Sequence, residues 1–249
     1  MTMHRRLIRH VRHIGAITVW LWVTAAQAQT LALPDNLIGL NSPQGRAMLI
    51  ESSAREAYWP LSLQFVTQKD PSYCGVASIV MVLNALGRHA PPLAGAEGYT
   101  AYTQDNLFNA ATEAILAREV LARQGMTLDQ LGRLFESFGV HAEVHHANDS
   151  SAEQFRARAA AAVATPGVHV VVNYLRAAIG QQSGGHISPL AAYESDTDRF
   201  LVMDVSRYKY PPVWASTADL FEAMNSVDAG NAGKRRGFVV VRERSAEPK

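Results

Sequence analysis

The stretch QKDPSYCGVASIVMVLNAL, residues 68–86, joins a polar loop to a long apolar run. Residues 75–86 are mostly apolar and Gly87 follows them, so this run predicts a helix that is buried on all sides. A buried helix must be covered by other elements, and this run therefore constrains the fold more than any other. Its start falls just after Pro71, which places the only cysteine of the chain, Cys74, at the helix N-terminus.

Helical patterns fill much of the rest of the first half. Over residues 107–124, apolar side chains recur at helical spacing, and Gly125 ends the run. Thr127 then suits the N-cap of a helix over residues 128–138. Residues 88–100 contain proline and glycine, and we expect them to form a loop.

The period of the hydrophobic pattern changes in the second half. We predict a half-buried strand over 140–145, a helix over 152–164, strands over 168–174, 186–193 and 200–205, a helix over 217–225 and a strand over 237–241. Residues 194–198 suit a hairpin turn between two of these strands. Helices followed by an antiparallel sheet indicate the α+β class.

The first 28 residues have the parts of a secretory signal peptide. A start rich in arginine precedes an uncharged apolar stretch over residues 14–26, and Ala26-Gln27-Ala28 is a suitable cleavage site. The apolar stretch is shorter than the roughly 20 residues of a membrane-spanning helix. We expect cleavage after Ala28, export to the periplasm and no stable membrane association, with an uncleaved anchor as the alternative.

The charge of the chain changes once this segment is set aside. Residues 29–249 carry 19 basic and 22 acidic residues, so the formal charge falls from +1 to −3 and gives no case for a nucleic-acid partner. This length suits a single domain with a sizeable core. One cysteine cannot form an intramolecular disulfide. The oligomeric state is left open, a homodimer included.

Three residues predict a nucleophilic site. Cys74 lies at a helix start, where unpaired N–H groups lower the pKa of a thiol; otherwise it is a small buried hydrophobe. His186 follows Gly184 and Gly185 and begins a strand, which suits an activating base. The hairpin brings Asp204 to within about two residues of the position opposite His186 on the neighbouring strand. If the two side chains share a face, their Cβ atoms lie about 5–8 Å apart. We therefore predict a Cys74, His186, Asp204 triad.

Gln68 is the candidate donor to the oxyanion. It precedes Cys74 by six residues, so its side-chain amide and the backbone N–H of Cys74 would both face the developing negative charge. The chain order of glutamine, cysteine, histidine and aspartate is that of papain-type enzymes. The alternative is a surface glutamine.

Longer stretches carry a family resemblance. QKDPSYCGVASIVMVLNAL, GGHISPLAAYESDTDRFLVMDVSRYKYPPVWAS and LFEAMNSVDAGNAGKRRGF resemble the catalytic domain of phytochelatin synthases over most of residues 64–241. The resemblance implies a papain-like fold and glutathione as substrate. Cys74 would attack the Cys–Gly amide of glutathione and expel glycine, His186 would protonate the leaving amine, Asp204 would orient His186, and Gln68 would line the oxyanion hole.

The resemblance also implies a set of substrate-binding residues. Asp228 and Arg235 would grip the γ-glutamyl end, with the adjacent Arg236 as the alternative arginine. Gly185 would let the backbone approach the substrate closely. The full set of expected binding residues is Asn173, Gly185, Arg207, Lys209, Tyr210, Asp228 and Arg235, of which Arg207, Lys209 and Tyr210 resemble acceptor-site residues or else form an exposed strand end.

The chain departs from the plant members of the family in having no cysteine-rich C-terminal extension and no second cysteine. Short bacterial relatives are associated mainly with glutathione hydrolysis. We therefore expect water as the main acceptor, giving γ-glutamylcysteine, and phytochelatin formation with a second glutathione as a secondary reaction. No cofactor is expected for acyl transfer, and Cd²⁺ or Zn²⁺ would stimulate it as the glutathione thiolate.

Two other functions are open. A papain-like peptidase acting on ordinary peptides is one, because the residues around Cys74 also resemble double-glycine leader peptidases. A non-catalytic thiol- or metal-binding module is the other. On the predicted strand, His141 and His145 share a face while His146 points away, so the three do not converge and we predict no metal site there.

Overall fold

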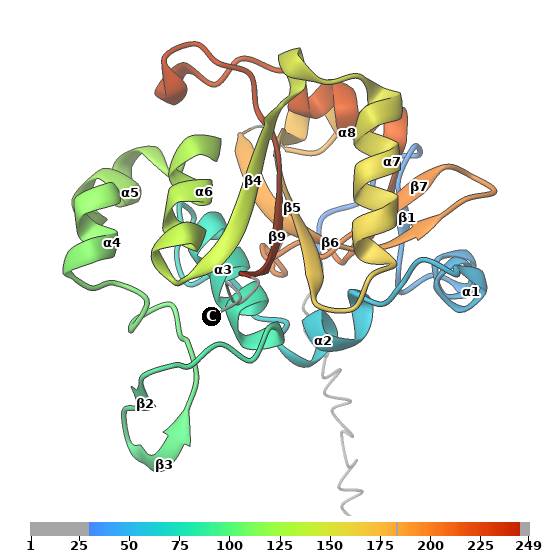
Figure 1. Cartoon of the computed structure of the whole chain (residues 1–249). Coiled ribbons are helices and arrows are strands. Elements are labelled where there is room, and N and C mark those ends of the chain that lie inside the picture. The colour runs from blue at the N-terminus through green and yellow to red at the C-terminus, as the bar shows by residue number, and fades with distance from the viewer. Residues whose placement is uncertain (1–29, 183, 245–249) are drawn as a thin grey trace, which may run out of the picture.

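The computed structural model describes residues 30–182 and 184–244, so the predicted signal peptide lies outside the described residues. The described part combines helices with an antiparallel sheet, and the α+β class is confirmed (Figure 1). The helices are α1 (Pro43–Glu51), α2 (Tyr58–Leu63), α3 (Cys74–Ala85), α4 (Ala110–Ile115), α5 (Arg118–Gln124), α6 (Leu128–Ser137), α7 (Ala152–Val163) and α8 (Thr217–Met224). The strands are β1 (Ile38–Gly39), β2 (Pro92–Leu93), β3 (Ala96–Thr100), β4 (Val140–His146), β5 (Val168–Leu175), β6 (Gly185–Glu194), β7 (Arg199–Val202), β8 (Val213–Ser216) and β9 (Gly237–Glu243).

Helix α3 is the predicted buried helix, and it begins at Cys74 as expected. Every residue from Cys74 to Leu83 is buried. The helix packs against β6, and the Ser78 hydroxyl donates hydrogen bonds to the carbonyl of Cys74 and, across to β6, to that of Ile187 at 3.2 Å. This contact fixes the nucleophile-bearing helix against the strand that begins beside His186.

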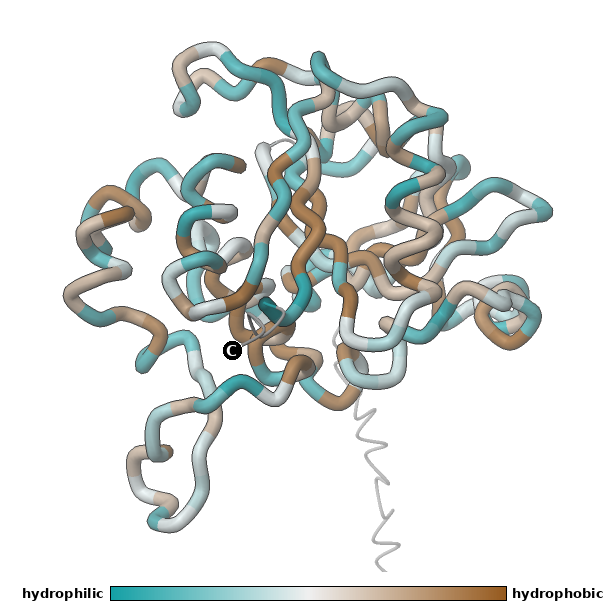
Figure 2. The backbone as a smooth tube through the Cα atoms, in the orientation of Figure 1, coloured by the Kyte–Doolittle hydropathy of each residue, from teal (hydrophilic) through white to brown (hydrophobic). Residues whose placement is uncertain are grey.

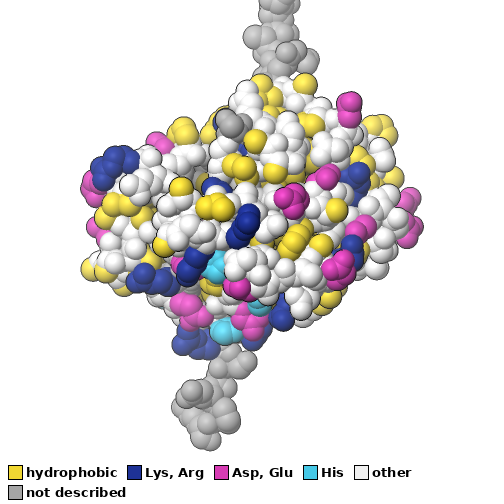
Figure 3. Space-filling view, turned by 90° about the horizontal axis from the view of Figure 1, so that it is seen from above, with side chains coloured by type: hydrophobic (Ala, Val, Ile, Leu, Met, Phe, Trp, Pro, Cys, Tyr) yellow, Lys and Arg dark blue, Asp and Glu magenta, His cyan; other side chains and the backbone are white. Residues whose placement is uncertain are grey.

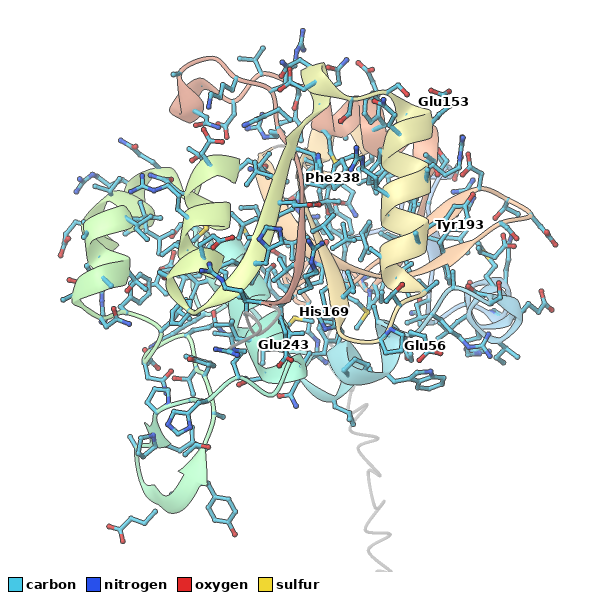
Figure 4. All side chains as sticks on the ribbon, viewed as in Figure 1. Glu56, Glu153, His169, Tyr193, Phe238 and Glu243 are labelled. Carbon is cyan, nitrogen blue, oxygen red and sulfur yellow. The ribbon has the colours of Figure 1, made fainter. Side chains whose placement is uncertain are left out.

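The main sheet has seven strands in the order β1-β8-β7-β6-β5-β9-β4, all antiparallel. Its central strands are largely hydrophobic (Figure 2). Helices α7 and α8 contact β5, whereas α6 contacts β4 and β9. In Figure 4, Phe238 of β9 is labelled beside α7, and its ring lies 5.1 Å from that of Phe155 in α7. Strand β9 thus lies between β5 and the edge strand β4, and its Phe238 packs in the core.

The β6–β7 hairpin is confirmed, but its second strand is shorter than predicted. The Glu194 carboxylate accepts the N–H groups of Asp196 and Thr197 and shapes the turn. Strand β7 ends at Val202, whereas the sequence pattern predicted a strand to residue 205. The Asp204 carboxylate accepts the N–H of Ser206, and this local turn ends the ladder.

Two predictions in the helical half are wrong in part. The single helix predicted over residues 107–124 is two helices, α4 and α5, because Leu116 and Ala117 are extended. The predicted loop at residues 88–100 contains the β2–β3 hairpin, which projects from the body of the protein in Figure 1. The predicted N-cap is confirmed, because Thr127 and Gln130 form a capping box at the start of α6. Among the described residues, no helix is both long and apolar enough to cross a membrane.

Candidate active site

Cys74 is the first residue of α3 and lines a cavity of about 590 Å³. The residue is only 7% exposed. Burial would raise the pKa of the thiol, but a hydrogen bond and a charge interaction with His186 outweigh burial and lower that pKa. A thiol with a lowered pKa forms the nucleophilic thiolate more readily than an ordinary cysteine does.

His186 lies at the start of β6 and links Cys74 to Asp204. Its Nε2 atom is 2.9 Å from Oδ1 of Asp204 and 2.9 Å from the Ser188 hydroxyl. Because Nε2 has these partners, Nδ1 is the nitrogen left for the thiol of Cys74. Burial would lower the pKa of His186, yet the charge and hydrogen bond of Asp204 raise it.

Asp204 is fully buried, and its hydrogen-bond donors all converge on Oδ1. Its Oδ1 accepts hydrogen bonds from His186, from Nη2 of Arg176 at 2.8 Å and from the backbone N–H of Ser206 at 2.8 Å. Burial would raise the pKa of this carboxyl group, but the charges and hydrogen bonds of His186 and Arg176 hold that pKa well below its usual range. The structure therefore brings the three predicted triad residues together.

Gln68 is buried behind the site rather than in the cavity wall. Its Nε2 donates to the carbonyls of Asp70 and Pro71, at 2.8 and 3.0 Å, and its Oε1 accepts the Ser206 hydroxyl. Both amide hydrogens are therefore used to shape the loop that leads into Cys74. In this arrangement Gln68 connects that loop to the chain beside Asp204, and its predicted donation to an oxyanion stays a prediction.

The cavity also has a charged pair and two further predicted residues. Asn173, Gly185 and Asp228 all line the cavity, and Arg236 lies beside Asp228 with 3.7 Å between Nη2 and Oδ1. Arg235 does not line the cavity, because its guanidinium donates to the backbone carbonyl of Asn225. The arginine beside Asp228 is therefore Arg236, and the placement expected for Arg235 is corrected.

The three expected acceptor-site residues lie outside the cavity wall. The Arg207 guanidinium stacks on the ring of Phe65 at 4.6 Å. Lys209 accepts the N–H of Leu31 through its backbone carbonyl. Tyr210 is buried, and its hydroxyl accepts the N–H of Gln182 at 2.9 Å.

Sequence reasoning missed several residues of the site. Arg176 follows a buried strand directly, which is the one local sign that this charge needs a buried partner. Tyr174 lies opposite His186 in the β5–β6 ladder, and their rings meet edge to face at 5.6 Å. The remaining cavity wall includes Asp70, Ser72, Arg123 and Met126.

The three histidines of β4 have separate surroundings. His146 lies between the carboxylate of Asp129 and the carbonyl of Arg235, at 2.7 and 2.6 Å. The ring of His145 stacks on Phe238, and His141 is half exposed beside acidic side chains. In the part of the chain that the structure describes, no group of three or more histidine, cysteine, aspartate or glutamate side chains is arranged to hold a metal ion.

The charged surface is mixed. On the face seen in Figure 3, basic and acidic side chains of the described residues are intermingled. This arrangement agrees with the small net charge of the chain.

Comparison with known proteins identifies a family that this chain matches. The family model described as phytochelatin synthase matches residues 28–238. Glutathione gamma-glutamylcysteinyltransferase 3 of Lotus japonicus is 30% identical over 214 residues, which are 85% of this chain and 43% of that protein. Glutathione gamma-glutamylcysteinyltransferase 1 of Arabidopsis thaliana is 29% identical over 85% of this chain and 43% of its own length. The glutathione gamma-glutamylcysteinyltransferase of Schizosaccharomyces pombe is 25% identical over 84% of this chain and 50% of its own length. The chain spans half or less of the length of these relatives.

Proposed function

The chain belongs to the phytochelatin synthase family, and from this premise we propose that it cleaves glutathione at the Cys–Gly bond through a γ-glutamylcysteinyl thioester on Cys74. One observation carries the proposal: Cys74 and His186 both line a cavity that also contains Asp228 and Arg236, and His186 is hydrogen-bonded to the buried Asp204. The names of the relatives support glutathione as the substrate. The helix-borne cysteine and the strand-borne histidine support a papain-like fold.

The first half of the reaction forms the thioester. The Cys74 thiolate attacks the carbonyl carbon of the Cys–Gly amide, and the oxygen of that carbonyl becomes negative. The backbone N–H groups at the start of α3 would donate to this oxygen, since Tyr73 makes no side-chain cap that occupies them. The His186 imidazolium then gives its proton to the glycine nitrogen, the C–N bond breaks, and glycine leaves.

The second half releases the acyl group. Neutral His186 takes a proton from the acceptor, which attacks the thioester carbonyl, and the Cys74 thiolate leaves. With water the product is γ-glutamylcysteine, which we propose as the main product. With the amine of a second glutathione the product is a phytochelatin, which is secondary.

The charged pair suits the γ-glutamyl end of glutathione, which is an amino-acid zwitterion. Arg236 would take its carboxylate and Asp228 its ammonium group, since each side chain carries the complementary charge. Asn173 supplies a buried amide in the same wall, and Gly185 leaves room beside Arg236. The cavity volume of about 590 Å³ is in the range of small-molecule sites.

These two acyl-transfer steps need no resident cofactor. Cd²⁺ or Zn²⁺ enters as part of the substrate, bound to the glutathione thiolate. We also propose export to the periplasm with cleavage after Ala28. Intact-mass spectrometry of the protein recovered from the periplasm should then give the mass of residues 29–249, with Gln29 free or cyclised; recovery from the membrane fraction with Met1 intact would contradict export with cleavage.

The decisive experiment is mass spectrometry of reduced glutathione incubated with the protein, with and without Cd²⁺. Wild type should release equal amounts of glycine and γ-glutamylcysteine, whereas Cys74→Ser should release neither while keeping the same circular dichroism spectrum. Longer (γ-Glu-Cys)n-Gly products would establish the transfer reaction. No turnover of glutathione together with cleavage of ordinary peptides would replace this proposal with a peptidase.

A further inference from the structure

Arg176 is a buried arginine whose guanidinium group faces Asp204. It lies in a short 3-10 helix, Arg176–Ile179, directly after β5, and is 3% exposed. Nη2 donates to Oδ1 of Asp204 at 2.8 Å, and Nη1 lies 2.8 Å from Oδ2. The first contact is a hydrogen bond and the second is a close ion contact, since Oδ2 has no hydrogen-bond partner among the described residues. Together they place one guanidinium nitrogen beside each carboxylate oxygen.

The remaining contacts of Arg176 fix the guanidinium itself. Nη1 donates to Oε1 of Gln181, and the charged carbon lies 5.4 Å from the centre of the Tyr210 ring. The Tyr210 hydroxyl is held in turn by the N–H of Gln182. The backbone N–H of Arg176 donates to Gly184, two residues before His186. Arg176 is therefore buried against Asp204 and is not one of the residues that line the cavity.

From these contacts we infer that Arg176 is a positioning residue, which fixes the plane of the Asp204 carboxylate and so aims His186 at Cys74. Four buried groups then lie in a row with alternating charge: Arg176, Asp204, His186 and Cys74. Without Arg176, Asp204 keeps only His186 and the N–H of Ser206, and nothing holds Oδ2. The carboxylate then loses its charged partner, and the imidazole is oriented only by this less firmly held carboxylate and the Ser188 hydroxyl.

The inference has a test that does not require glutathione. Alkylation of Cys74 by iodoacetamide at pH 6 reports the thiolate that His186 maintains. Arg176→Met should slow this alkylation by about 10- to 100-fold, the size of effect seen for outer-shell partners. Arg176→Lys should fall between this variant and wild type, because lysine restores the charge but not the two-point contact.

Arg156→Met is the matched control. Arg156 also contacts both oxygens of a carboxylate, through hydrogen bonds to Asp198 at 2.8 and 2.7 Å. Both side chains are more than one-third exposed, and neither lines the cavity. Its alkylation rate should stay within about twofold of wild type. Millimolar guanidinium chloride should restore part of the lost rate in Arg176→Met and change neither wild type nor the control.

The kinetic arm rests on the proposed function. Arg176→Met should lower kcat for glycine release by about 10- to 100-fold with KM nearly unchanged. A raised KM with normal kcat would make Arg176 a substrate-binding residue and overturn the inference. Faster alkylation of Arg176→Met, with a lowered Tm and no rescue by guanidinium, would show a purely structural role and overturn the inference. An alkylation rate equal to that of wild type would overturn it too. If wild type is alkylated rapidly but releases no glycine, the proposed function fails while the alkylation arm still decides the role of Arg176.

Discussion

Gly185 lies directly against the guanidinium group of Arg236. A Cβ atom on Gly185 would be 3.1 Å from Nη2 and 3.4 Å from Nε, which is closer than ordinary contact. The backbone of Gly185 is not in the left-handed region, so glycine is needed here because a side chain would crowd Arg236, not because of the backbone conformation. The strand that begins at Gly185 and the loop that carries Arg236 are therefore fitted to each other at the cavity.

Gly185→Ala should weaken glutathione binding without unfolding the protein. The added methyl group displaces Arg236 at a cost of about 1 kcal/mol, which corresponds to roughly a fivefold increase in KM. Gly230→Ala is the matched control, because a Cβ there meets Asp228 only at 3.6 Å. Steady-state kinetics and thermal melts of both variants check the prediction; equal KM values for the two would contradict it.

Arg236→Met should raise KM for glutathione far more than Arg235→Met. Loss of a charge-assisted contact with the substrate costs about 1.5–3 kcal/mol, or roughly 10- to 100-fold in KM. Arg235 has its guanidinium on the carbonyl of Asn225, outside the cavity, so its variant should bind glutathione almost normally. Isothermal titration with glutathione on the Cys74→Ser background measures binding without turnover, and a larger loss for Arg235→Met would reverse the assignment.

Asp204→Asn should damage both catalysis and stability. The amide nitrogen of asparagine cannot accept from Arg176 or His186, so one buried donor loses its partner. We expect kcat to fall by roughly 10³- to 10⁴-fold, the effect of the same change in serine proteases. Breaking a buried ion pair should also cost about 3 kcal/mol of unfolding free energy.

Urea unfolding of Asp204→Asn, followed by tryptophan fluorescence, measures that stability loss. Asp198→Asn is the control for a carboxylate paired with arginine outside the site. Normal kcat in Asp204→Asn would remove Asp204 from the triad, whatever its stability.

The elements with strong local signals were predictable from the sequence. Helix α3 has a long, mostly apolar run, and Thr127 marks the start of α6 as a typical N-cap residue. The partnership of Asp204 with His186 could be predicted only up to the register of the hairpin, which the sequence leaves open. In the structure the register shifts between Leu190 and Ala192, so that Leu190 pairs with Val202, and Asp204, just past the end of β7, reaches His186.

The parts that escaped prediction depend on contacts between distant segments. Strand β8 has four residues and β1 has two, which is too short for a hydrophobic period to register. Arg235 and Arg236 are adjacent, and the bridge between Val227 and Arg235 decides which of them turns toward the cavity. The burial of Arg176 depends on Asp204, 28 positions away.

The pH dependence of thiol reactivity should show the thiolate–imidazolium pair directly. Because the pKa of Cys74 is lowered and that of His186 is raised, alkylation of Cys74 should already be fast well below the ordinary pKa of a cysteine, near 9. His186→Ala removes the strongest influences that lower the pKa of Cys74. Burial, which raises that pKa, and the weaker backbone hydrogen bonds of Gly75 and Ile187 remain, so the alkylation profile should shift to higher pH.

Stability should change with pH in the direction set by His186. Its pKa is raised in the folded state, so the stabilisation from the charged imidazole beside Asp204 is complete below about pH 6.5, the unfolded pKa, and is lost as pH rises through the folded pKa. The thiol of Cys74 titrates in the opposite sense, so the test uses the Cys74→Ser background. There, Tm should decline relative to that of the Cys74→Ser, His186→Ala double variant as pH rises above 6.5. Parallel Tm curves for the two proteins between pH 5 and 9 would mean that His186 carries no charge in the folded state, and the thiol of Cys74 would then need another cation to lower its pKa.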